Sequence, residues 1–187
     1  MSAATRTTIE MAYDSHLFLE VPAALRGSEA APDEWIASTI ASLNAGAAWT
    51  DDPAGLAQRL RAQLALLSSD AAMAFLFCPD GLPGDALVEV FAAPTDATDV
   101  DDIVSESLVA LPQRVDRVHT DSLGEGRVVA SVAAIPEGAI AALRFQFVAS
   151  GLLVEVAVTS SDLAVLGTAL PIFEQLAAGI TLADAPR

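Results

Sequence analysis

Residues 126–182 decide the fold of this chain, and they read GRVVASVAAIPEGAIAALRFQFVASGLLVEVAVTSSDLAVLGTALPIFEQLAAGITL. Apolar residues alternate with Arg144 and Gln146 in the middle of this stretch, and again with Glu155 a few residues later. A period of two is typical of a strand that is buried on one face. The small residues at 149–151, between the two alternating runs, favour a hairpin turn. We therefore predict three successive antiparallel strands, followed by a helix.

The last part of this stretch predicts a helix that closes over the sheet. Its apolar residues recur at spacings of three and four, which places them on one stripe: Leu166, Leu170, Phe173, Ala177 and Ile180. Pro171 has no backbone N–H to donate, so the helix is expected to begin near it or to bend there. The stripe needs an apolar partner, and the strand face that carries Phe145 and Phe147 can supply it. We expect Phe173 to be the central contact.

The chain upstream predicts further strands and two helices. Residues 7–21 favour one or two short strands. Proline and acidic residues at 32–34, and again at 51–53, suit the first turn of a helix, so we expect one helix to begin at each place. Residues 71–78 form a continuous apolar run, which is typical of a strand covered on both faces. Residues 87–91 predict another strand.

Between these strands and the closing stretch lies an acidic segment, residues 94–102, that leads into a predicted short helix. Four apolar residues align along that helix: Val100, Val104, Leu108 and Leu111. Residues 113–121 and 127–135 then predict a strand pair around a glycine-containing turn.

The order of these elements predicts an α+β fold. Strands and helices come first, an antiparallel meander follows, and a helix closes the chain, so the simplest arrangement is an antiparallel β-sheet covered by helices. At 187 residues the chain is long enough to bury a core of its own. We expect a single domain over residues 1–187, with the first strands and two helices in 1–70 and the sheet with its closing helix in 71–182.

Two segments carry a resemblance to a known family: VHTDSLGEGRVV (118–129) and ALPIFEQLAAGITL (169–182), with the two strands between them. Together they resemble the C-terminal half of PsbP-like α/β/α sandwich proteins, and the similarity covers residues 71–182. The resemblance implies an α/β/α sandwich. Since such proteins are mostly accessory, chaperone or adaptor proteins of larger assemblies, it also implies a non-enzymatic role. It carries over no site residue.

The chain is strongly acidic, with a formal net charge of -16 at pH 7. All nine of its basic residues are Arg, and none is Lys. A small number of scattered arginines disfavours binding to nucleic acid and to anionic membrane surfaces. The absence of Lys excludes a Walker A phosphate loop, a pyridoxal-phosphate Schiff base and a protein kinase active site. Solubility is the simplest explanation of the acidity.

The sequence also bears on the compartment. The first residues lack the basic and apolar regions of a signal peptide, and no apolar run is long enough to cross a bilayer. A single Cys permits no internal disulfide, which agrees with a reducing compartment. We predict a cytoplasmic protein without membrane insertion, unless a secretion system that needs no classical signal exports it.

An enzyme hypothesis can nominate His119, Asp121 and Cys78. A His beside a carboxylate can act as a general base, and a thiol can act as a nucleophile next to a His. In a strand, however, His119 shares its face with Arg117, while Asp116 points to the other face. Cys78 ends an apolar run, where a free Cys is usually buried. We therefore interpret His119 as a surface residue and Cys78 as a core residue, and predict no catalytic residue.

The acidic segment could hold a cation. Asp96, Asp99, Asp101 and Asp102 are hard oxygen ligands of the kind that Ca²⁺ prefers, but their spacing differs from that of an EF-hand. Asp99 as a helix cap, with Asp101 and Asp102 near the positive end of the helix dipole, explains the same residues. We predict that the protein needs neither a metal nor a cofactor.

These observations favour a small cytoplasmic binding module, an adaptor or chaperone-like accessory protein that acts on another protein. The partner is an unidentified protein, and a homodimer remains open. The first alternative is a carrier that holds an apolar small ligand between the sheet and the two early helices. The second is an enzyme that uses His119, Asp121 and Cys78.

Overall fold

The computed structural model describes residues 7–26, 32–46, 51–103, 113–136 and 138–184 of the 187-residue chain. The strands are β1 (Thr7–Met11), β2 (Phe18–Glu20), β3 (Met73–Phe77), β4 (Leu87–Pro94), β5 (Arg114–Thr120), β6 (Gly124–Ile135), β7 (Gly138–Ala149), β8 (Leu152–Ser160) and β9 (Ile180–Asp184). The helices are α1 (Asp33–Ala45), α2 (Pro53–Leu64), α3 (Leu163–Thr168) and α4 (Leu170–Ala178), with 3₁₀ turns η1 (Ala23–Leu25) and η2 (Val100–Asp102).

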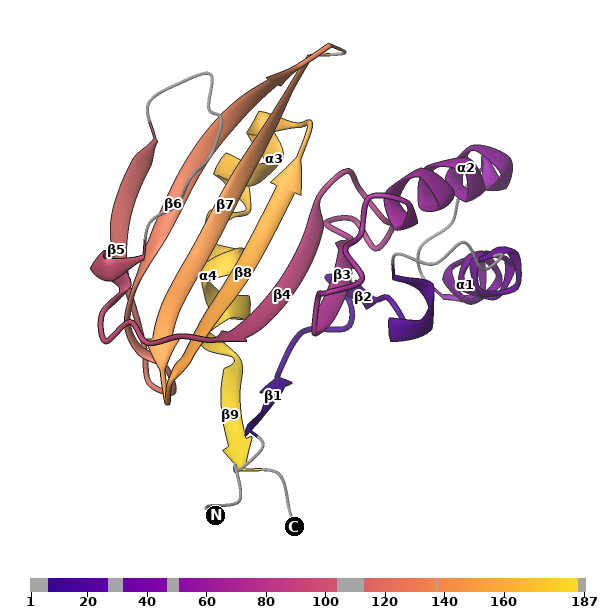
Figure 1. The fold of residues 1–187 in the computed structure, drawn as a ribbon. Helices are drawn as coiled ribbons and strands as arrows, with labels where there is room; N and C mark the ends of the chain where they lie inside the picture. Colours follow the sequence, from indigo (N-terminus) through magenta and orange to yellow (C-terminus); the bar gives the residue numbers. More distant parts are fainter. Residues whose placement is uncertain (1–6, 27–31, 47–50, 104–112, 137, 185–187) are drawn as a thin grey trace.

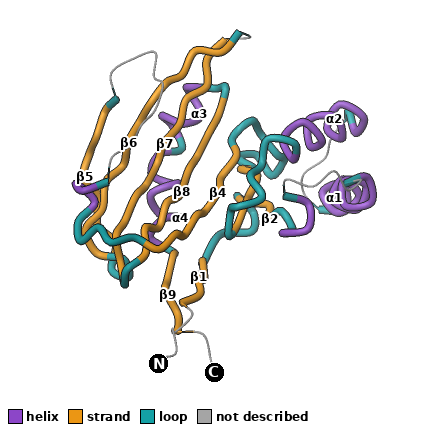
Figure 2. Tube along the Cα trace, in the orientation of Figure 1, coloured by secondary structure: helices purple, strands orange, loops and turns teal. Residues whose placement is uncertain are grey.

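Seven strands form one antiparallel sheet in the order β2-β3-β4-β8-β7-β6-β5, and β1 pairs with β9 in a separate ribbon (Figure 1). The predicted α+β class with an antiparallel sheet is therefore confirmed. The predicted meander runs through β5, β6, β7 and β8, and Figure 2 shows these long strands side by side. Ser150 and Gly151 join β7 to β8 with φ angles of 53° and 73°, the left-handed pair that a tight two-residue hairpin turn requires.

Helices α3 and α4 cover one face of the sheet, as Figure 1 shows behind β6, β7 and β8. Their buried side chains meet a core that contains six of the seven Phe residues: Phe18, Phe75, Phe77, Phe145, Phe147 and Phe173. We call this core the aromatic cluster. Phe173 is fully buried, and its ring centre lies 5.0 Å from that of Phe77 and 6.4 Å from that of Phe18. Phe173 is thus the central helix contact, as the sequence predicted.

Helices α1 and α2 pack on the opposite face, at the β3–β4 end of the sheet. The core there is aliphatic and consists of Val21, Ile36, Leu56, Leu60, Leu64, Leu67, Ala74, Leu76 and Leu87. We call it the leucine cluster. β3 contributes alternate residues to both clusters, which explains its continuous apolar sequence. Asp52 caps α2 by accepting a hydrogen bond from the Gly55 N–H at 2.8 Å, as acids at 51–53 predicted.

The closing helix bends where the sequence predicted and differs from its prediction at its C-terminal end. It is broken at Ala169 into α3 and α4, which agrees with the bend expected at Pro171. It ends at Ala178, whereas the apolar stripe predicted helix as far as Ile180. Ile180 instead begins β9, and it is fully buried there. A side chain at Gly179 would lie 2.3 Å from the Ala12 carbonyl oxygen, so this Gly permits the close approach at which β9 leaves the helix for β1.

The short helix predicted after the acidic segment is described only in part. η2 covers Val100–Asp102, and Val100 is buried. Val104, Leu108 and Leu111 lie outside the described residues. Among the helices of the described ranges, none has the length and apolar character that crossing a membrane demands.

Candidate functional site

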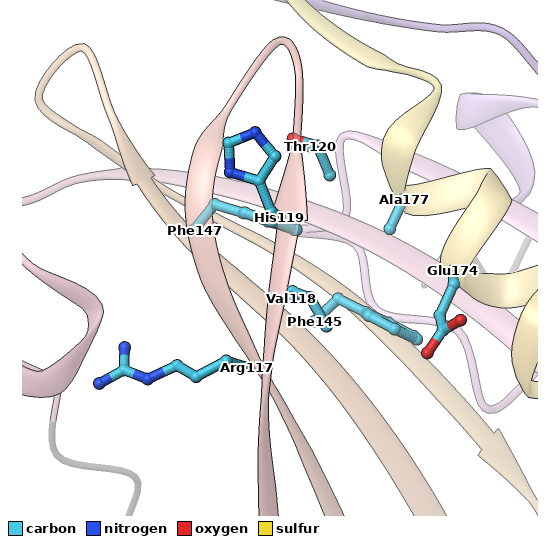
Figure 3. A pocket seen from close by; sticks show the side chains of 8 residues that line it. All are labelled: Arg117, Val118, His119, Thr120, Phe145, Phe147, Glu174 and Ala177. Carbon is cyan, nitrogen blue, oxygen red and sulfur yellow. The ribbon is translucent and has the colours of Figure 1, made fainter.

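A hollow of about 270 Å³ lies between the edge strand β5, the strand β7 and the helix α4 (Figure 3). Phe145 and Phe147 of β7 form its floor, Val118 lies on the β5 side and Ala177 on the α4 side. Glu174 stands at its rim. Arg117, His119 and Thr120 of β5 also line the hollow, so its apolar floor is bordered by polar and ionisable side chains.

A glycine on β6 creates part of this space. Gly126 pairs with Val118 of β5 on one side and with Phe147 of β7 on the other. A Cβ atom at Gly126 would lie 2.4 Å from the Phe147 ring, so only Gly lets this ring lie across β6. The hydroxyl of Thr120, which also lines the hollow, already accepts a hydrogen bond from the Leu123 N–H.

His119 lies on the other side of β5 from Glu174, together with Arg117, as Figure 3 shows. The sequence predicted this shared face. His119 Nδ1 is 2.8 Å from Glu125 Oε1, and both side chains are more than half exposed. Arg117 pairs with Asp101, whose hydrogen bond and charge raise the Arg117 pKa and keep the guanidinium ionised. The partner of His119 is therefore the cross-strand Glu125, not the Asp121 that the enzyme hypothesis paired with it.

Cys78 lies far from His119. It follows β3, and four strands lie between β3 and β5 in the sheet, so five strand spacings place the two residues roughly 24 Å apart. Cys78 is only 4% exposed, and its burial raises the pKa of the thiol to about 11. A thiol in this state is a poor nucleophile at neutral pH. The structure thus does not bring together the three residues of the enzyme hypothesis.

The carboxylates of the acidic segment bind a backbone N–H of the same segment and an arginine of β5. Asp99 caps η2, because its Oδ1 accepts a hydrogen bond from the Asp101 N–H at 2.9 Å. Asp101 is paired with Arg117. Asp102 lies in the first turn of η2, where an acid favours the helix dipole. Within the described part of the chain, no group of three or more His, Cys, Asp or Glu side chains is placed to hold a metal ion.

A row of polar side chains crosses β6, β7 and β8 on the face opposite α3 and α4. Arg127 Nε donates to Gln146 Oε1 at 2.8 Å, and Gln146 Nε2 donates to Glu155 Oε2 at 2.6 Å. Arg144 donates to the other oxygen of Glu155 at 3.4 Å. Arg127 Nη2 also donates to the Ile103 carbonyl at 2.8 Å. Because Gln146 is only 2% exposed, the centre of this row is buried, and Arg127 links it to the backbone at Ile103.

Sequence reasoning identified the members of this row only as the polar side of alternating strands. Their common register, with Arg127 opposite Gln146 and Gln146 opposite Glu155, is the signal that could have found it. That register follows from the length of the β6–β7 and β7–β8 turns.

A second hollow lies at the end of α4, beside the segment between β1 and β2. It has a volume of about 520 Å³, and we call it the Tyr13 groove. Its lining is mainly apolar: Ala12, Tyr13, Asp14, Leu17, Phe18, Ile172, Gln175, Leu176, Ala178 and Gly179. The Tyr13 hydroxyl donates to Glu20 at 2.9 Å, and partial burial with the nearby Glu20 carboxylate raises the Tyr13 pKa. Sequence reasoning missed this groove because it joins residues far apart in the chain.

The carrier hypothesis placed an apolar ligand between the sheet and the two early helices. Side chains fill most of this region, and a hollow of about 210 Å³ lies where the end of α2 meets β4 and β7. Leu56 and Leu60 of α2 and Ile36 of α1 are buried against Ala74 and Leu76 of β3. Close packing of this kind is the ordinary state of a protein interior.

Comparisons of the sequence with known proteins do not assign this chain to a family. No protein-family model matches the chain, and no curated protein matches it in sequence.

Proposed function

We propose that this protein is a small, non-enzymatic binding module that serves as an adaptor or chaperone-like accessory protein of a larger assembly. We also propose that its sheet and helices form an α/β/α sandwich of the PsbP-like type, and that it acts in the cytoplasm. Helices on both faces of an antiparallel sheet support the fold proposal. The separation of Cys78 from His119 across the sheet supports a non-enzymatic role.

The Tyr13 groove is the observation that carries the binding proposal. Its walls combine the half-buried apolar side chains Leu17 and Ile172 with the exposed polar Asp14 and Gln175. An apolar wall with a polar rim is the usual character of a protein-binding surface. Because the chain carries a net charge of -16, the complementary partner is a segment with apolar anchors and basic flanks.

The test is a peptide selection followed by measured affinities. A displayed library of random peptides is selected on the protein, and the enriched peptides are expected to combine apolar anchors with Arg or Lys. Ala178 is exposed at the groove, so Ala178→Arg should fill the groove without disturbing the fold. We expect the variant to bind the selected peptides about tenfold more weakly in calorimetric titrations.

Ala37→Arg is the matched control, because Ala37 is an exposed helical alanine on α1 and the charge change is the same. It should bind as the wild type does. Equal peptide affinity in all three proteins would contradict the proposal. Binding of an apolar fluorescent dye in the groove, with no peptide selected, would favour the carrier function instead.

A further inference from the structure

The edge strand β5 presents one side of its backbone for pairing. β5 ends the strand order of the sheet and pairs with β6 alone among the described strands. It is seven residues long, whereas the strand at the other edge, β2, has three. Its residues 114–117 are all exposed. A long exposed edge is a template for another strand, unless its side chains prevent the approach.

The side chains of β5 are complementary to a second copy of themselves. Arg114 and Asp116 flank Val115 and lie on the same face of the sheet, where their Nε and Oδ2 atoms are 2.7 Å apart. Both side chains are more than half exposed. In an antiparallel pair of β5 strands with Val115 opposite Val115, each Arg114 lies opposite the other copy's Asp116. The pairing thus creates two cross-strand ion pairs related by a two-fold axis.

Other registers lack this complementarity. A two-fold axis through Asp116 places two carboxylates opposite each other, and one through Arg117 places two guanidinium groups opposite each other. The axis through Val115 also explains why an apolar side chain is exposed at this position, because the two Val115 side chains then lie opposite each other. The Val115 side chain is 54% exposed, which makes it one of the few large apolar residues on the surface of the described chain.

We propose that the protein forms a two-fold symmetric dimer through antiparallel β5–β5 pairing centred on Val115. The two seven-stranded sheets then become one continuous sheet. The Tyr13 groove stays open in this dimer, because α4 separates it from β5: Ala177 faces the β5 hollow, while Ala178 faces the groove. The dimer therefore displays two grooves. The proposal does not depend on what the grooves bind.

The test is a charge-exchange experiment read by sedimentation equilibrium. The wild-type chain of 19.3 kDa is expected to sediment as a dimer at high concentration. Arg114→Asp places two carboxylates opposite each other at both ends of the interface, and Asp116→Arg does the same with two guanidinium groups. Each variant should dissociate about tenfold more readily, or be a monomer.

Recombination of the charges makes the test specific. An equimolar mixture of the Arg114→Asp and Asp116→Arg chains restores both ion pairs, so it should form a one-to-one heterodimer. The double variant Arg114→Asp/Asp116→Arg should again form a homodimer. Arg59→Asp is the matched control, because Arg59 is exposed on α2 away from β5, and its dimer should match the wild type.

Three outcomes would overturn the proposal. The first is a wild-type chain that stays monomeric up to its solubility limit, in which case the charges of β5 act as a guard against pairing. The second is a dimer whose dissociation constant is unchanged in both single variants. The third is a mixture of the two variants that forms no heterodimer while each chain remains folded by circular dichroism.

Discussion

The two apolar clusters lie on opposite faces of one strand, β3, and they differ in how many strands of the sheet contribute to them. The aromatic cluster takes residues from β2, β3, β4, β6, β7 and β8 and from both closing helices. The leucine cluster takes its sheet residues from β3 and β4 alone, and the rest come from α1, α2 and the segments beside them. Damage to the aromatic cluster should therefore weaken the whole sheet, whereas damage to the leucine cluster should act mainly at one end.

The largest expected effect is that of Phe173→Ala. Phe173 is fully buried at the centre of the aromatic cluster, so the substitution should lower the free energy of unfolding by about 3–5 kcal/mol. The measurement is urea unfolding followed by far-ultraviolet circular dichroism and by tryptophan fluorescence. In a Trp49→Phe background the fluorescence reports on Trp35, which packs against the leucine cluster. Both signals should shift together, because the sheet and its helices then lose stability as one unit.

Leu60→Ala is the matched change in the leucine cluster, where Leu60 is also fully buried. Its expected cost is about 2–5 kcal/mol. Here the Trp35 signal should change at lower urea than the circular dichroism of the sheet. If the two signals stay coincident in Leu60→Ala, the clusters unfold together and the comparison is wrong.

The caps of α3 and α2 test the same difference between the two clusters with smaller changes in stability. Asp162 caps α3 by accepting hydrogen bonds from the Ala164 and Val165 N–H groups, and Asp52 caps α2. Replacing either by Ala should cost about 1 kcal/mol. Asp162→Ala should lower the urea midpoint of both the circular dichroism and the Trp35 fluorescence. Asp52→Ala should lower the midpoint of the Trp35 fluorescence more than that of the circular dichroism. The conservative Asp→Asn variants should retain most of the cap and serve as controls.

Cys78 belongs to neither cluster, and the expected effect of replacing it is of the same order as that of losing a helix cap. Because burial raises its pKa to about 11, the folded state holds the thiol proton more tightly than the unfolded chain does. Stability from this group is present at neutral pH and is lost as the pH rises from about 9 to about 11. Cys78→Ala should cost at most about 1–2 kcal/mol at pH 7 and should reduce the loss of stability across that alkaline range.

Reactivity offers an independent check on Cys78. The native thiol should react with a disulfide reagent at pH 8 far more slowly than the unfolded chain does. Rapid labelling of the folded protein would show that the thiol is accessible and would refute its assignment to the core.

The parts of the fold that could be predicted from the sequence are those that local periodicity specifies. The alternation around Arg144 and Glu155 predicted β7 and β8, and the Ser150-Gly151 pair predicted the turn between them. Asp52-Pro53 predicted the start of α2. In each case a few neighbouring residues carry both the pattern and its physical cause.

The parts that could not be predicted depend on contacts between distant residues. Ile180 fits the helical stripe of α4 and also suits a strand, and only its pairing with Met11 decides between them. The Tyr13 groove likewise joins residues near position 13 to residues near position 176. The face of His119 was predictable from strand alternation, but its partner Glu125 depended on the register of β5 and β6.

The ribbon of β1 and β9 makes the molecule mechanically soft at its ends. Thr7 lies opposite Asp184 at the outer end of the ribbon, and Met11 lies opposite Ile180 at the inner end. A pull on Thr7 and Asp184 therefore loads the cross-strand hydrogen bonds one pair at a time, because these bonds run perpendicular to antiparallel strands. The ribbon should unzip under low force before any load reaches the seven-stranded sheet. Tension applied between Thr7 and Asp184 would thus lengthen the protein while its seven-stranded sheet stays folded.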